Sequence, residues 1–130
     1  MPGSVANRLC DYVPQLRNAA EDWRLRLIVH DFGHVWKYSD PAVRPLLIVD
    51  EPDPVGDPHW DAFLAAYAEH LAYHARIEAP SWVFDDSRYL TRWWIPVADL
   101  ESLRVEAFVH APAAFEAHGV FIARRELEVV

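Results

Sequence analysis

The sequence has one cysteine, Cys10, only four glycines and no long apolar run. A single cysteine excludes an internal disulfide framework and is typical of a protein of the reducing cytosol. No stretch approaches the ~20 apolar residues that a membrane span needs, and the N-terminus lacks the basic and then apolar pattern of a signal peptide. We therefore expect a cytoplasmic protein without a membrane partner.

Basic residues are scarce as well. The chain has 12 Lys and Arg against 20 Asp and Glu, which gives a net charge of −8 with neutral histidines. Duplex nucleic-acid binders depend on Lys and Arg that contact phosphates, so this balance argues against direct nucleic-acid binding. It suits a protein whose partner is itself basic.

The common catalytic motifs are missing. Gly56 and Gly119 do not form a phosphate-binding loop, and neither the dinucleotide-binding nor the P-loop pattern occurs. No G-x-S-x-G elbow is present, and the sequence assigns no partner histidine to Cys10. We expect no catalytic residue and no cofactor, and the sequence disfavours an enzyme.

What the sequence does contain predicts a mainly α fold. Its 130 residues, 52% of them hydrophobic and 25% charged, suit one compact helical domain over residues 1–130. We expect about five to six helices, with one short β-hairpin or an extended C-terminal tail as possible additions.

The clearest helix lies in the middle of the chain. Asp57 is a good N-cap, and Pro58 suits the first helical position. One stripe at helical spacing consists of Trp60, Phe63, Leu64, Tyr67, Leu71 and His74. The pattern predicts a helix from about Pro58 to Arg76 that ends before Pro80.

The N-terminal third also reads as helix. Ser4 is a candidate cap for a short piece through Val5, Leu9 and Tyr12, after which Pro14 restarts the chain. One expected face of the next helix consists of Leu16, Ala20, Trp23, Leu27, His30 and His34, and a second of Ile28, Phe32 and Val35. A helix that is apolar most of the way round is expected to be central to the core.

Shorter segments follow on either side of the middle helix. Asp40-Pro41 repeats the cap and proline pattern, and residues 46–49 fit either a helical turn or a strand. Residues 50–58 hold three prolines, a glycine and four acidic residues, so they predict an exposed loop. Beyond Pro80 we expect helices at 87–93 (capped by Asp85 or Asp86), at 100–108 and from Pro112 to Gly119, and then a strand or buried tail at 120–122.

Two histidine pairs, His30/His34 and His70/His74, are spaced four apart on expected helices. This spacing places both imidazoles on one helix face, as metal ligation by two histidines requires. Neither pair has the glutamate of a zinc-protease helix, and a neutral histidine bonded to a backbone carbonyl is common in cores. A metal-binding protein or metal-dependent enzyme that uses these four residues is our alternative interpretation.

The surplus of indole rings points to a binding surface. Four of the six tryptophans lie between residues 60 and 94, and Trp93 and Trp94 are adjacent. Neighbours on a helix are about 100° apart, so one of the two is expected to be partly exposed. We expect Trp93 and Trp94, with Arg88 and Arg92, to form a contact patch of the residue types that dominate binding hot spots, although both rings could instead fill the core.

The acidic loop is a second candidate contact surface. Asp50, Glu51 and Asp53 depart from the spacing of a calcium-binding loop, and prolines limit how their carboxylates converge. The loop can serve instead as an acidic docking edge for a basic partner.

Several segments also carry a family resemblance. They are 54–64, 68–72, Trp82, 92–96, 103–104, 111–115 and 119–122. Together, over roughly residues 23–128, they resemble a family of uncharacterised, largely actinobacterial, small helical proteins. In that family a similar region often follows a helix-turn-helix in regulator-like or antitoxin-like proteins, whereas this chain lacks a recognisable DNA-reading module.

The resemblance implies a helical, non-enzymatic regulatory or toxin-neutralising partner. Together with the charge and the tryptophans, it leads us to expect a protein-interaction module, one half of a toxin–antitoxin or similar regulatory pair. The expected partner is another protein, a basic toxin or regulator encoded nearby. A homodimer formed through the tryptophan patch is a further option.

Overall fold

Helices form the regular structure of this chain, as the sequence predicts. The computed structural model describes residues 7–97 and 101–128, and within these ranges there is no strand. An isolated parallel bridge joins Trp94 to Val120, so the expected hairpin, which needs antiparallel strands, is wrong for the described part of the chain. None of the described helices combines the length and apolar content that a bilayer span requires.

Contacts between the described residues group the chain into two compact units, residues 7–55 and residues 56–97 with 101–128. The first contains η1 (Leu9–Tyr12), α1 (Val13–Arg17), α2 (Glu21–Leu25), η2 (Arg26–Phe32), α3 (Gly33–Lys37) and α4 (Arg44–Ile48). The second contains α5 (Pro58–Ala75), η3 (Ser81–Phe84), η4 (Asp86–Arg88), α6 (Glu101–His110), α7 (Ala113–Ala117) and η5 (Arg124–Leu127). The expectation of one domain over residues 1–130 stays a prediction.

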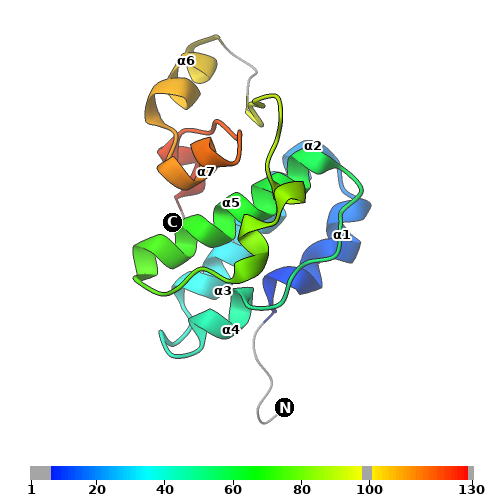
Figure 1. Cartoon of the computed structure of the whole chain (residues 1–130), viewed down its shortest axis with the longest axis vertical. Helices are drawn as coiled ribbons and strands as arrows, with labels where there is room; N and C mark the ends of the chain where they lie inside the picture. Colours follow the sequence, from blue (N-terminus) through cyan, green and yellow to red (C-terminus); the bar gives the residue numbers. More distant parts are fainter. Residues whose placement is uncertain (1–6, 98–100, 129–130) are drawn as a thin grey trace. The chain divides into compact units, whose positions relative to one another are not determined.

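In the first unit, α2, η2 and α3 form one uninterrupted helical run, drawn in light blue and cyan in Figure 1. The expected single helix is instead broken at Asn18, which ends α1. Segment η2 is π-helical, and its wider turn shifts the side chains that follow it. The buried residues of these helices are Leu16, Ile28, Val29, Phe32 and Trp36.

The first face predicted for the N-terminal helix is wrong beyond Leu16, which is buried. Trp23, His30 and His34 all lie at the surface, whereas Ile28 and Phe32 of the second face are buried. The break after α1 and the π-helical turns change the helical phase, and an unbroken 3.6-residue period cannot reproduce that change. Ser4 and Val5 lie outside the described residues.

Short elements complete the core of the first unit. The Tyr12 ring meets the Phe32 ring edge to face at 5.7 Å, and α4 buries Leu47 and Ile48. Residues 46–48 are therefore helical, which decides between the two structures that fit the sequence. The following loop leaves Asp50 exposed, as predicted.

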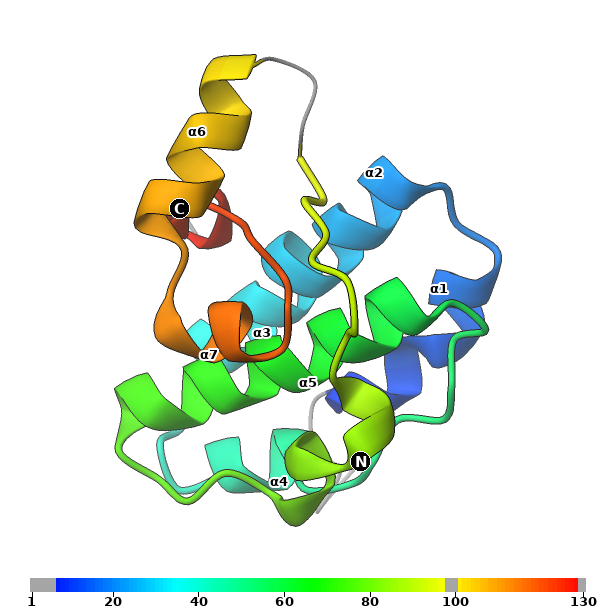
Figure 2. The same cartoon turned by 45° about the horizontal axis from the view of Figure 1, so that its top comes forward.

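Helix α5 begins and ends where the sequence predicts. The Asp57 carboxylate accepts a hydrogen bond from the His59 backbone N–H at 3.0 Å, and the helix ends at Arg76, whose φ of 59° is left-handed. The predicted stripe is buried through Tyr67, half-buried at Leu71 and exposed at His74. Both views show α7 lying against α5, drawn in green, in the second unit (Figures 1 and 2).

The predicted helix at 87–93 is much shorter in the structure. Asp85 does cap it, accepting a hydrogen bond from the Ser87 backbone N–H at 3.0 Å, but η4 ends at Arg88. Beyond it the Leu90 N–H donates to the His118 carbonyl at 3.1 Å, and the Trp94 N–H donates to the Gly119 carbonyl at 2.9 Å. Long-range pairing with the C-terminal segment thus replaces the local helix.

The C-terminal elements agree with the sequence more closely. Helices α6 and α7 form where they are expected, although residue 100 lies outside the described residues. Gly119 follows the end of α7 with a φ of +82°, and the chain then runs extended with Val120 and Ile122 buried. Residues 120–122, for which the sequence fits either a strand or a buried tail, therefore form the buried tail.

We expect Gly119→Ala to destabilise the protein more than Gly56→Ala. Both glycines have positive φ, so each substitution costs about 1–2 kcal/mol of backbone strain. A Cβ at Gly119 would also lie 3.0 Å from the Leu90 Cβ, whereas nothing lies within 4 Å of one at Gly56. Crowding adds about 1–3 kcal/mol at Gly119 alone, which urea denaturation of both variants measures. Equal losses of stability would contradict the packing described here.

Candidate functional site

An apolar patch lies on the surface of the second unit. Trp93 is 55% exposed, and its ring meets Phe108 of α6 edge to face at 4.9 Å. Phe108 in turn meets Phe121 at 4.9 Å. Val105, one turn before Phe108, shares its helix face and is 59% exposed, and Val109, one turn after Val105, is 67% exposed. We call these residues the apolar patch: Trp93, Val105, Phe108, Val109 and Phe121.

The backbone around Trp94 explains why its neighbour lies outside. Trp94 bridges to Val120 in an extended conformation, in which successive side chains point to opposite sides. The Trp94 ring stacks on His59 at 4.7 Å and meets the edge of Trp60 at 5.1 Å, so it is half-buried against the start of α5. The prediction that one of the adjacent tryptophans is partly exposed is confirmed, and that residue is Trp93.

The two arginines proposed for the same patch differ in exposure. Arg92 is exposed, but Arg88 is only 3% exposed. The Arg88 guanidinium donates to the Asp61 carbonyl at 3.1 Å and lies over the Trp82 ring at 4.9 Å. Arg88 therefore stabilises the interior, and the expectation that it contacts a partner has to be corrected.

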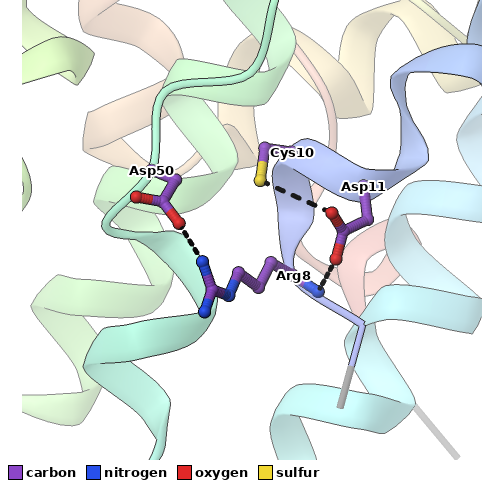
Figure 3. A network of polar contacts seen from close by, with 4 residues as sticks. All are labelled: Arg8, Cys10, Asp11 and Asp50. Atoms are coloured by element: carbon purple, nitrogen blue, oxygen red, sulfur yellow. Dashed lines mark hydrogen bonds and ion pairs between the residues drawn. The ribbon is translucent and has the colours of Figure 1, made fainter. Parts of the chain in front are cut away.

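The acidic loop of the first unit is exposed at Asp50, Glu51 and Asp53. Asp50 forms an ion pair with Arg8, as Figure 3 shows. The Arg17 guanidinium donates two hydrogen bonds to the Pro54 carbonyl, at 2.8 and 3.2 Å. These contacts attach the two ends of the acidic stretch, Asp50 and Pro54, to Arg8 and to Arg17 of α1.

Cys10 lies beside this loop, next to the carboxylates of Asp11 and Asp50. Its Sγ lies 3.8 Å from a carboxylate oxygen of Asp11 (Figure 3). Burial raises the pKa of the Cys10 thiol, and the negative charges of Asp11 and Asp50 raise it further, more than Arg8 lowers it. The thiolate form that nucleophilic catalysis needs is thereby disfavoured.

The histidine pairs lie in different units. His30 and His34 line a hollow of about 390 Å³ in the first unit, and the His70 and His74 rings, 4.5 Å apart, line a cavity of about 540 Å³ in the second. His34 and His74 were expected among core residues, but both are exposed. Over residues 7–97 and 101–128, no group of three or more His, Cys, Asp or Glu is placed to hold a metal ion.

A buried polar network in the second unit escaped the sequence analysis. The ring of His118 is fully buried, with Nδ1 2.8 Å from the Arg88 carbonyl oxygen and Nε2 2.7 Å from Oε1 of Glu69. The Tyr89 ring stacks on the imidazole at 4.2 Å. These contacts join α5, the end of η4 and the end of α7.

The hydrogen bonds of His118 determine its protonation. A carbonyl only accepts, so Nδ1 carries a hydrogen and donates it to Arg88. One further proton must lie between Nε2 and the Glu69 carboxyl group, because two acceptors do not form a hydrogen bond. Whichever atom holds that proton, the His118–Glu69 pair has no net charge.

We expect Glu69→Ala to lower the free energy of unfolding by about 1–3 kcal/mol, because it leaves Nε2 of the buried His118 without a partner. Glu69→Gln should cost less, since its amide can donate to a neutral imidazole. Glu116→Ala on the surface of α7 is the control, with an expected change within about 0.5 kcal/mol. Urea denaturation measures all three variants, and equal losses for Ala and Gln would contradict this description of the network.

Comparisons with models of protein families, with curated proteins and with solved structures found no match to this chain.

Proposed function

We propose that this chain is a cytoplasmic, non-enzymatic protein-interaction module that binds another protein through the apolar patch. In this proposal it acts as the antitoxin-like or regulatory half of a toxin–antitoxin type pair. The observation that carries the proposal is the position of Trp93, 55% exposed and in contact with a second exposed aromatic ring. The sequence resemblance to antitoxin-like proteins supports a toxin–antitoxin type pair in particular.

The patch has the chemistry of a binding hot spot. Tryptophan is among the residues that contribute most to interfaces, and its large ring becomes buried there at little cost in conformational entropy. Phe108 packs against the Trp93 ring, and Phe121 packs against Phe108. These contacts restrict the Trp93 ring before a partner binds. Val105 and Val109 extend the apolar surface along α6. Contiguous exposed apolar residues of this kind mark interaction sites on soluble proteins.

The charge of the chain favours a basic partner. Residues 56–128 hold 12 acidic and six basic residues, a net charge of −6 with neutral histidines. A field of this sign attracts a positively charged protein and raises its association rate. The exposed carboxylates of Glu51 and Asp53 in the first unit add to the same field.

We expect Trp93→Ala to weaken binding to the basic product of a neighbouring gene by at least about tenfold, as the loss of a hot spot does. Trp23→Ala is the matched control, since Trp23 is 53% exposed but belongs to the first unit. Calorimetric titration of the purified partner measures both affinities.

Two outcomes would contradict this proposal. One is a Trp93→Ala variant that binds as well as the Trp23→Ala control. The other is a wild-type chain that binds no product of a neighbouring gene at micromolar concentration. Light scattering on the chain alone separates a third outcome, a homodimer that Trp93→Ala dissociates.

Neutralising the loop should slow association without speeding dissociation. We expect the double variant Glu51→Gln, Asp53→Asn to lower the association rate constant a few-fold at low salt, an effect that fades above about 0.5 M salt as charges become screened. Stopped-flow fluorescence with the partner measures both rate constants. An unchanged association rate would show that the loop does not attract the partner.

A further inference from the structure

The cavity of about 540 Å³ in the second unit is large enough for a small-molecule ligand. One side of it is polar, with side chains of Glu69, His70, His74 and Arg124. The small apolar side chains of Pro112 and of the α7 residues Ala113, Ala114 and Ala117 also line it, together with Tyr73 of α5. The cavity therefore offers both charge recognition and an apolar surface.

The polar wall carries a net positive charge. Glu69 shares one proton with the buried His118, so the pair contributes no net charge to the cavity. Arg124 is then the remaining fixed charge among the described residues that line it. A cavity of positive charge in a chain of net charge −8 is unusual, because the rest of the protein repels anions.

His70 is a half-buried neighbour of Arg124 in this cavity. Burial lowers the pKa of His70 to about 4, and the charges of His74 and Arg124 contribute to this shift. The imidazole is therefore neutral at pH 7 and has one ring N–H to donate. An anion in the cavity would be attracted to Arg124 and would also favour the protonated form of His70.

We propose that this cavity binds a small organic carboxylate, held by Arg124 and His70, with its apolar body against the alanines of α7. The planar guanidinium matches a carboxylate through two parallel hydrogen bonds. A single fixed positive charge suits a monoanion better than a phosphate dianion. The alanine wall has no group to bond a polar body, so it favours an aromatic or aliphatic one.

Benzoate is a suitable probe, and the His70 ring signals in NMR spectra of histidine-labelled full-length protein are the readout. We expect benzoate to shift these signals saturably at pH 7 and to raise the pKa of His70 from about 4 toward the ordinary value of 6.5. Benzamide, which has the same ring without the charge, should bind at least about tenfold more weakly.

Two neighbouring arginines provide the matched variants. Arg124→Gln should weaken benzoate binding at least about tenfold. Arg125→Gln should leave it unchanged, because Arg125 pairs with Glu106 at 2.8 Å and does not line this cavity. Trp93→Ala should also leave it unchanged, so this proposal can fail or hold independently of the protein-interaction proposal.

Four results would overturn the carboxylate site. They are an absence of any His70 shift up to about 10 mM benzoate, equal binding of benzamide, equal loss of binding in the two arginine variants, and inorganic phosphate binding as tightly as benzoate. The last result would indicate a simple anion site in which the apolar wall has no role.

Discussion

The second unit depends on one buried imidazole. His118 joins α5 through Glu69 and the end of η4 through the Arg88 carbonyl, and its own carbonyl accepts the Leu90 N–H. The last contact fixes the extended segment that follows η4. Because Trp94 then bridges to Val120 in this segment, Trp94 faces the core and Trp93 faces outward. The apolar patch is thus a consequence of a hydrogen bond made in the interior.

The same imidazole also sets the charge of the cavity beside α5. Glu69 would carry a full negative charge into the cavity if it were unpaired, and Arg124 would then be compensated. Since the pair that Glu69 forms with His118 has no net charge, no net negative charge in the lining of the cavity compensates Arg124. His118, which lines neither surface, therefore supports two surfaces of different chemistry: the apolar patch and the polar cavity.

Local signals predicted the elements that local interactions form. Asp57 and Pro58 specify the start of α5 through hydrogen bonding and backbone geometry within a few residues. The partial exposure of one of the two adjacent tryptophans was also predicted, but from the spacing of a helix that ends before them in the structure. Which of the two is exposed depends on the bridge between Trp94 and Val120. Only the prediction for α5 needed no knowledge of the rest of the fold.

What the sequence could not predict depends on distant residues. His118 and Glu69 are 49 residues apart, and no spacing pattern connects them. Arg88 follows a capping aspartate in an aromatic segment, a setting that suits a surface arginine, and only its contacts with Asp61 and Trp82 show that it is buried. The buried face predicted for the N-terminal helix was wrong for another reason. Hydrophobic periodicity assumes a constant number of residues per turn, and this helix is broken after α1 and π-helical in η2.

The π-helical segment η2 has a consequence for the length of the chain. A π turn accommodates about one residue more than an α turn, so Arg26–Phe32 contains a surplus residue relative to a regular helix. Deleting a single residue there would convert the wide turn into a regular α-helix and would keep α3 in phase with α2, so that Trp36 stays buried with Phe32. A deletion in the regular turns of α2 or α3 has no wide turn to compensate for it, and it would rotate the residues that follow by about 100°. The first unit therefore tolerates the loss of one residue better within η2 than in the helices on either side of it.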